Sequence, residues 1–239
     1  MNMLTNHLSL SIVVPFRNER SLVASMVTAH GQLQSSQVEF IYVDDGSIDG
    51  SGDELRQLNA GATILRLDGV GTGKAFLAGA HRANGRYILL LPIDCAVSRA
   101  GIDELLLASS SDRAGVVLFP KKYASTETMS PYALLQNLVL LKAIKLASWT
   151  NGFVFHRKLL TALERATKEV FLNDLEFSRN LRGEKWHVLA NEISVSARRY
   201  EQDGAWRRIL INGLILLLWQ FKLASTQRLH QIYKRGKNV

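Results

Sequence analysis

The fold is decided by the stretch Ile41-Tyr42-Val43-Asp44-Asp45-Gly46-Ser47, an apolar run that ends in two carboxylates and a turn. The later stretch Ile88-Leu89-Leu90-Leu91-Pro92-Ile93-Asp94 has the same form. Short apolar runs of this kind are typical of strands buried on both faces of a parallel sheet. Acids at the carboxyl ends of neighbouring strands line the crevice where open α/β sheets bind ligands. The sequence therefore predicts a nucleotide-dependent enzyme.

Strands and helices alternate through the first half of the chain. Apolar runs predict strands at 10–14, 38–43, 62–67 and 87–91, with Pro15 ending the first one, and helical patterns fall at 53–58 and from the Gly73 region to residue 83. This alternation implies right-handed βαβ units and a mostly parallel sheet. Further along we expect helices at 102–108 and 132–147, strands at 115–119 and 186–190, and a polar loop at 120–130. That loop is either a surface connection or a segment that closes over substrate.

Length, composition and charge limit the classes of protein and of partner that fit this chain. A chain of 239 residues suits one large domain, and a formal net charge of +8 favours anionic partners such as nucleotide sugars, phospholipid head groups or nucleic acid. The basic tail lacks the aromatic or zinc-ligand patterns of nucleic-acid modules, so no nucleic acid is expected. The single Cys95 excludes an internal disulfide. Residues 1–7 do not resemble a signal peptide, which makes a cytoplasmic protein the default expectation.

Two familiar phosphate-binding motifs are excluded. A P-loop would need glycine where Asp68 stands and a hydroxyl residue where Ala75 stands. No G-x-G-x-x-G opens the helix after the first strand, so a dinucleotide fingerprint is absent as well. Gly71 and Gly73 are interpreted as keeping a loop close to a nucleotide, with Lys74 available to a phosphate oxygen.

The order of these motifs resembles that of the family 2 glycosyltransferases. The resemblance rests on residues 13–19 (VVPFRNE), 43–51 (VDDGSIDGS), Gly73-Lys74 with the small residues at 79, 83 and 85, and Asp94, and it covers at least residues 8–183. It implies a GT-A fold, a nucleotide-sugar donor, a divalent metal (Mg²⁺ or Mn²⁺) and inversion at the anomeric carbon.

The family's functional residues carry over to particular positions of this chain. Asp174, in Asn173-Asp174-Leu175-Glu176, resembles the catalytic base, and Asp94 resembles the metal-binding acid of the Asp-x-Asp motif. A carboxylate base is needed because a sugar hydroxyl is a poor nucleophile, and a cation would stabilise the departing diphosphate. Asp44 resembles the acid that reads the edge of the base. The expected donor-binding residues are Pro15, Phe16, Arg17, Glu19, Asp44, Asp45, Gly46, Ser47, Gly73, Lys74, Ile93 and Asp94.

Two positions depart from the family pattern. Pro92 stands where the first acid of Asp-x-Asp usually lies, and Asn173 replaces the Glu that usually precedes the base. The first change leaves Asp94 alone for metal or ribose contact. Both changes keep open a weak metal dependence, or a protein that binds nucleotide without turnover.

The carboxyl-terminal part resembles a small bacterial subgroup of the family with unassigned substrates. Arg198 and Arg199 suit a diphosphate or an acceptor phosphate, and would be equally ordinary as surface arginines. His156 is either a metal ligand or structural. The Gln-x-x-Arg-Trp motif of polymerising members is absent, so we expect one sugar transfer per encounter.

The most apolar segment, 209–218, runs on to Trp219 and Phe221 and is too short to span a bilayer. It is either a buried helix of the domain, a membrane-interface helix or a partner-binding helix. An acceptor on a polyprenyl phosphate at the inner face of the cell membrane would suit such a tail.

The sequence thus predicts one GT-A-like α/β domain over residues 1–239. Its nucleotide-binding half is 8–119, its acceptor and catalytic half is 120–203, and its helical, basic and apolar tail is 204–239. The expected activity is inverting, non-processive transfer from a UDP- or GDP-sugar. The alternatives are a degenerate nucleotide- or glycan-binding protein and a nucleotidyltransferase, although 15–19 is not the basic glycine-rich loop that the latter normally shows.

Overall fold

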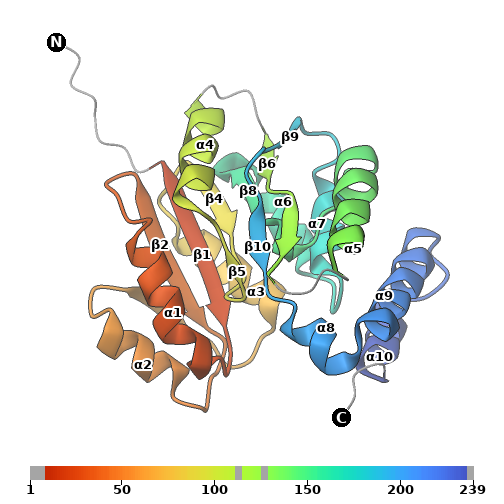
Figure 1. Ribbon diagram of the computed structural model, residues 1–239, viewed down its shortest axis with the longest axis horizontal. Helices are drawn as coiled ribbons and strands as arrows, with labels where there is room; N and C mark the ends of the chain where they lie inside the picture. Colours follow the sequence, from red (N-terminus) through yellow and green to blue (C-terminus); the bar gives the residue numbers. More distant parts are fainter. Residues whose placement is uncertain (1–8, 111–114, 125–128, 236–239) are drawn as a thin grey trace.

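A central β-sheet organises the molecule in the computed structural model, which describes residues 9–110, 115–124 and 129–235. Within these residues its spatial order is β3 (Thr63–Arg66), β2 (Val38–Asp44), β1 (Leu10–Phe16), β4 (Tyr87–Leu90), β8 (Phe153–His156), β6 (Val116–Leu118) and β9 (Trp186–Val188). The strands β3, β2, β1 and β4 are parallel, β8 runs antiparallel to both β4 and β6, and β6 and β9 are parallel. The mostly parallel α/β sheet expected from the sequence is confirmed (Figure 1).

Alternate residues of β1 face opposite helix layers. Ile12 and Val14 pack in a core with α1 (Arg20–Gly31), α2 (Ser51–Leu58) and α4 (Arg99–Ser110). Val13 packs in a second core with α3 (Thr72–Arg82), α6 (Leu160–Ala166) and α7 (Asn173–Asn180). Because both faces of β1 are buried, its sequence is a nearly continuous apolar run and does not alternate between apolar and polar residues.

The first strand is longer than the sequence predicts. It continues through Pro15 to Phe16, whereas Pro15 was expected to end it. The missing N–H of proline is tolerated because pairing with β4 stops at Val13, so beyond that point β1 pairs with β2 alone. Pro15 and Phe16 are buried residues of the strand and do not form a loop.

A small second sheet lies in a region expected to be irregular. It has the order β5 (Cys95–Ala96), β10 (Ile193–Val195) and β7 (Lys121–Tyr123). The strand β7 falls inside the predicted polar loop 120–130, of which residues 125–128 lie outside the described part. The helix predicted at 132–147 is a short α5 (Ser130–Leu135) that continues as the π-helix η2 (Gln136–Ala143). The 3-10 turns η3 (Trp149–Asn151) and η4 (Arg157–Leu159) flank β8.

The last described helices are α8 (Arg198–Asp203), α9 (Ala205–Gln220) and α10 (Thr226–Arg235), of which α9 and α10 lie together at one side of the molecule (Figure 1). A third apolar cluster joins them to the domain. Its buried members are Leu146, Ile215, Trp219 and Leu229. A search of the described helices finds none with the length and hydrophobicity needed to cross a bilayer.

Candidate functional site

The loops after β1 and β2 are held together by side-chain hydrogen bonds. The Ser47 hydroxyl accepts from the backbone N–H of Asn18 at 3.0 Å, and the Asn18 side chain accepts from the N–H of Ile48 at 2.9 Å. The carboxylate of Asp44 is buried and accepts from the N–H of Ser47 at 2.8 Å. Asp44 therefore shapes the turn, which is what Asp does when it accepts from a backbone N–H a few residues on.

Asp45, the second acid of the pair, holds a different loop. Its two carboxylate oxygens accept from the N–H groups of Val70 and Gly71, at 2.7 and 2.9 Å. Gly46 makes this approach possible, because it has φ +77° and a Cβ there would lie 3.0 Å from the backbone nitrogen of Gly69. The glycine-rich segment before α3 is thus fixed against the carboxyl end of β2.

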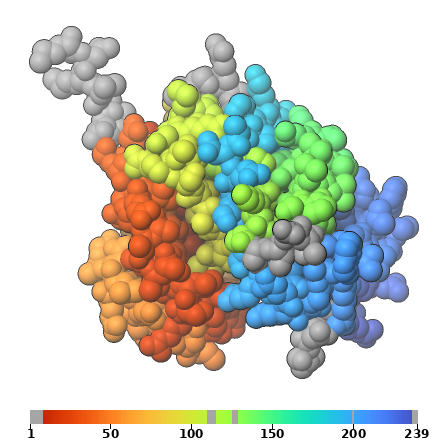
Figure 2. Space-filling view, in the orientation of Figure 1, coloured from red at the N-terminus to blue at the C-terminus, as the bar shows by residue number. Residues whose placement is uncertain are grey.

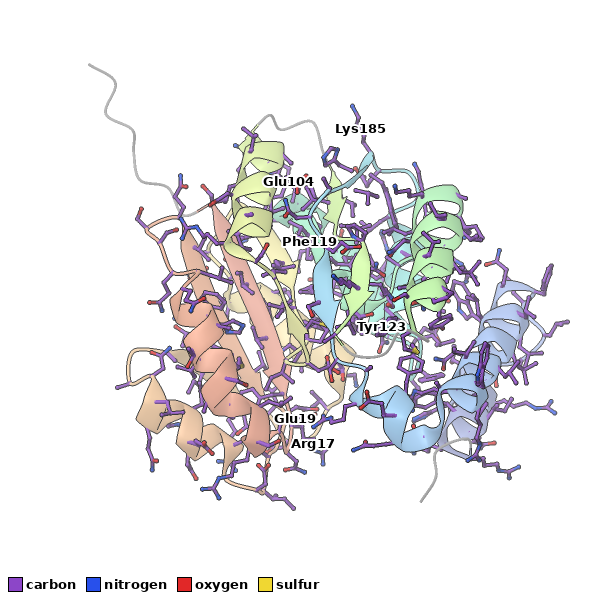
Figure 3. All side chains as sticks on the ribbon, in the orientation of Figure 1. Arg17, Glu19, Glu104, Phe119, Tyr123 and Lys185 are labelled. Carbon is purple, nitrogen blue, oxygen red and sulfur yellow. The ribbon has the colours of Figure 1, made fainter. Side chains whose placement is uncertain are left out.

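Glu19 pairs with Arg198 across 179 positions of sequence. A guanidinium nitrogen of Arg198 lies 3.0 and 2.8 Å from the two Glu19 carboxylate oxygens. Figure 3 shows Glu19 and Arg17 together at the carboxyl end of β1, beside α8. Glu19, predicted to bind the donor, and Arg198, predicted to bind a diphosphate or an acceptor phosphate, therefore meet in one ion pair. The side chain of Arg199 lies outside the described part of the structure.

Asp94 lies between β4 and β5, at the same edge of the sheet. Its backbone carbonyl accepts from the N–H of Ser196 at 3.0 Å, which connects it to the segment carrying Arg198. Its carboxylate is 3.7 Å from the Cys95 sulfur, and the residue is partly exposed. Ile93 is partly buried against the core.

Asp174 lies in the first turn of α7, directly after Asn173, and is partly buried. The N–H of Leu175 donates to its carboxylate at 3.0 Å, and the N–H of Trp149 also donates to it. Burial raises the pKa of Asp174, while these two N–H groups and the charge of Lys121 act in the opposite direction. A carboxylate with a raised pKa is suited to accepting a proton near neutral pH.

Asn173 has a packing role that a glutamate could not fill. Its amide nitrogen donates to the carbonyls of Ala166 and Glu169, at 3.0 and 2.8 Å. Its amide oxygen lies so close to Gly73 that a Cβ there would be 2.5 Å away. The start of α3 and the start of α7 are therefore in contact. Lys74, which follows Gly73 in α3, lines a pocket of about 550 Å³ between α3 and α6.

The residues predicted from sequence are partly brought together. The edge formed by the ends of β1, β2 and β4 carries Arg17, Glu19, Asp45 and Asp94. His156 is placed elsewhere: it pairs with Tyr87 at the opposite end of β4, and its ring accepts from the N–H of Lys158. The interpretation of His156 as a ligand beside Asp94 is therefore wrong, because β8 runs antiparallel to β4.

Lys121 is a site residue that the sequence analysis missed. It is 4% exposed and donates to the hydroxyls of Ser148 and Thr150, at 2.8 and 3.0 Å. Its position in Lys-Lys-Tyr before a polar stretch suggested a loop. The only clue in the sequence was period-two alternation, which puts Lys121 on the same buried face as Tyr123.

A family model supports the assignment of the chain. The model described as glycosyl transferase family 2 matches residues 11–172. The chain belongs to glycosyltransferase family 2. The matched range begins within β1 and ends at the residue before α7, so it contains the loops after β1 and β2 and Asp94.

Solved structures agree with the fold of this family 2 chain. The mannosyltransferase PcManGT from Pyrobaculum calidifontis, in complex with GDP-Man and Mn²⁺, has a TM-score of 0.64 at 18% identity, over 92% of this chain and 66% of that one. TarS 1-349 from S. aureus has a TM-score of 0.63 at 13% identity, over 85% of this chain and 64% of that one. Its complex with UDP-GlcNAc matches at 15% identity over 79% and 58%. This chain thus spans roughly two thirds of the TarS fragment or less.

Proposed function

We propose that this family 2 member transfers a single sugar from a nucleotide-sugar donor, UDP- or GDP-linked, to an acceptor hydroxyl or phosphate, with inversion at the anomeric carbon. The observation that carries the proposal is the meeting of donor-side and base-side residues. The small sheet places β5, which follows Asp94, and β7, which carries Lys121, on either side of β10. Lys121 donates to Ser148 and Thr150, which flank Trp149 beside the Asp174 carboxylate. The acid proposed to face the donor diphosphate is therefore connected through Lys121 to the acid proposed as base.

Asp174 has the role of general base in this proposal. Its carboxylate takes the proton of the attacking acceptor group while the sugar leaves the diphosphate. Arg17 and Arg198 are the cations placed to meet the diphosphate, because arginine forks match phosphate oxygens. Donor binding then requires Arg198 to share or leave its partner Glu19.

The residues fit a divalent cation only in a limited way. Among the described residues no group of three or more His, Cys, Asp and Glu side chains could hold a metal ion. Mg²⁺ is commonly bound by one or two carboxylates together with substrate phosphates, so Asp94 alone is a sufficient protein ligand in that mode. When bound, such an ion neutralises charge on the leaving diphosphate.

Thermal-shift titration tests donor recognition first. The protein is titrated with UDP, GDP, CDP and TDP, each with and without Mn²⁺, because a ligand of the native state raises its stability. We expect one nucleotide to raise the melting temperature, with a larger shift when Mn²⁺ is present. In Asp94→Asn the Mn²⁺-dependent part should be lost. No shift with any nucleotide would contradict the proposal, and tight binding without donor hydrolysis or transfer would favour the non-catalytic alternative.

Peripheral membrane contact through α9 is the second part of the proposal. One face of this helix exposes Trp206, Leu210, Leu214 and Leu217, which are 49–74% exposed, and Phe221 follows at 67%. The neighbouring α5 and η2 also expose apolar side chains, namely Leu134, Leu135, Leu138 and Val139. Helices of this kind bind anionic bilayers through apolar burial and nearby basic residues. The acceptor would then be attached to the membrane, for example as a polyprenyl phosphate.

Two features of the tail correct the sequence-based picture of this surface. Trp219, for which the sequence left both burial and a membrane interface open, is 4% exposed and donates to Glu176. Arg208 is buried as well, and pairs with Asp203 and the Tyr233 hydroxyl. The exposed aromatic residues are instead Trp206 and Phe221 (Figure 2, α9 in blue).

Vesicle co-sedimentation distinguishes this surface from an ordinary exposed helix. We expect the protein to sediment with anionic phosphatidylglycerol vesicles more than with neutral phosphatidylcholine vesicles. The double variant Leu210→Glu/Leu214→Glu should lose sedimentation and keep the nucleotide-induced thermal shift. Leu107→Glu, at a 75%-exposed position on α4, is the matched control and should sediment normally. Equal sedimentation of all three proteins, or of none, would contradict the membrane proposal.

A further inference from the structure

Lys121 is a buried cation that the proposed chemistry leaves without a role. It sits on β7, and its backbone is clamped by Asn137 of η2, which accepts from its N–H and donates to its carbonyl, both at 2.9 Å. A lysine is almost never fully buried unless its charge is paired. If the Lys121 side chain stays charged in this buried position, it therefore needs a partner of opposite charge nearby.

The segment 148–150 connects this cation with Asp174. The hydroxyls of Ser148 and Thr150 accept from the Lys121 ammonium, and the N–H of Trp149, between them, donates to the Asp174 carboxylate. The same segment is fixed to α7 by Ser178, whose hydroxyl accepts from the N–H of Ala147 at 3.0 Å and donates to its carbonyl at 2.9 Å. One short stretch of backbone therefore holds the cation on one side and the acid on the other.

We propose that Lys121 is the positioning residue for Asp174: it pins the 148–150 segment that holds the carboxylate, and its charge favours the ionised acid. The inference rests on the proposed function only in treating Asp174 as the general base. The link between the buried Lys121 and the partly buried Asp174 stands without that role.

The electrostatics act in the same direction. Burial lowers the pKa of Lys121 to about 8, and electrostatic interactions with Cys95 and Asp174 act to raise it. Burial raises the pKa of Asp174, and the Lys121 charge opposes that rise. The other acid of the same helix turn, Glu176, is directed away, toward Arg179 and Trp219. Cys95 on β5 is the remaining titratable group that interacts with the ammonium.

The test replaces Lys121 with methionine, which keeps the length of the stem and removes the charge. Lys122→Met is the matched control, because Lys122 is the exposed neighbour on the same strand. If Lys121 keeps Asp174 ionised, the acidic limb of the kcat–pH profile for transfer or donor hydrolysis should move up by about one pH unit in Lys121→Met. In Lys122→Met it should stay in place. A profile that does not move in Lys121→Met would overturn the inference.

A second measurement does not depend on catalysis. Urea midpoints at pH 7 are compared for the wild type, Lys121→Met, Asp174→Asn and the double variant. We expect the double variant to lose less than the sum of the two single losses, because the second change removes a charge already left unpaired. Additive losses would overturn the inference. If the wild type shows neither transfer nor hydrolysis with any donor, the proposed function fails and this cycle still decides the role of Lys121.

Thr150→Val covers the case in which Lys121→Met does not fold. It preserves the shape of the side chain and removes one of the ammonium's two hydroxyl acceptors. The acidic limb should move in the same direction by a smaller amount, and an unmoved limb would count against the proposal.

Discussion

At the scale of single residues, the two adjacent acids of the turn after β2 have different tasks. Asp44 is 1% exposed and shapes its own turn through Ser47, whereas Asp45 fixes the loop before α3. The resemblance to the family suggested Asp44 as the acid that reads the base. That role stays a prediction.

Replacing Asp174 should separate binding from turnover. We expect Asp174→Asn to lower kcat by about 10²- to 10⁴-fold, because a positioned general base contributes on that order. The nucleotide-induced thermal shift should be unchanged. The wild-type kcat should fall as pH drops through a pKa above the usual carboxyl range, since burial raises the pKa of Asp174 and the base must be ionised. Unchanged turnover in this variant would exclude Asp174 as the base.

His30 should make the protein sensitive to acid. Burial lowers the pKa of His30 to about 4, and its ring stacks on Phe40 with Nδ1 3.1 Å from the Tyr42 hydroxyl. The unfolded chain takes up the proton near pH 6.5 and the folded chain only near 4, so the free energy of unfolding falls as pH drops through that window, by at most about 3 kcal/mol.

Urea unfolding between pH 7 and 4 measures this effect. The double variant His30→Phe/Tyr42→Phe removes both polar partners and keeps the rings. Its free energy of unfolding should depend less on pH in this window than that of the wild type. Parallel pH curves for the two proteins would show that His30 is not the responsible group.

At the scale of elements, the close packing of α3 on the sheet depends on Gly79. A Cβ at this position would overlap Val13 Cγ1 and lie 3.0 Å from Val43 Cγ2. The helix therefore approaches β1 and β2 as closely as a residue without a side chain allows. This contact also sets the position of Gly73 against Asn173 at the start of the helix.

Two glycine-to-alanine changes test that contact. Gly79→Ala should lower the free energy of unfolding by about 1–3 kcal/mol through overpacking, whatever it gains in helix propensity. Gly213→Ala, in α9 where a Cβ would meet nothing within 4 Å, should raise it by about 0.5–1 kcal/mol. Denaturant titration of both variants measures these changes in the free energy of unfolding. A stabilised Gly79→Ala would mean that α3 can move away from the sheet at no cost.

At the scale of the whole molecule, the carboxyl-terminal helices are joined to the site. Trp219 of α9 donates to Glu176 at 2.8 Å, and the Arg179 guanidinium lies 3.9 Å from the centre of the Trp219 ring. Both partners are in α7, the helix that carries Asp174 in its first turn. The described part of the tail, residues 204–235, therefore packs against the half of the chain that is predicted to be catalytic, and we expect it to unfold together with the rest of one domain.

Thermal unfolding tests this expectation of a single domain. Calorimetry should show one transition, coincident with the fluorescence change of the tryptophans. Deleting residues 204–239 should lower the melting temperature, because it uncovers Leu146, Phe171 and Leu175, which pack against the removed helices. Two separated transitions, or a truncated protein of unchanged stability, would contradict the single-domain prediction.

The sequence by itself determined the parallel part of the sheet and the edge where the candidate site lies, but it did not predict the inner strand β8. Strands buried on both faces must be apolar throughout, so β1, β2 and β4 could be located to within about two residues, and acids at their ends had to share one edge. Motif order was enough to indicate the family, because the loops at that edge are local in sequence.

Only the tertiary structure decided which of these side chains meet. The pairing of Glu19 with Arg198, the displacement of His156 to the far edge and the burial of Lys121 beside the segment that holds Asp174 all join residues distant in the chain. No local pattern encodes such contacts, since they depend on strand order and on the antiparallel direction of β8. The strand β7 was missed for the same reason: a short polar run becomes a strand only because β10 is there to pair with it.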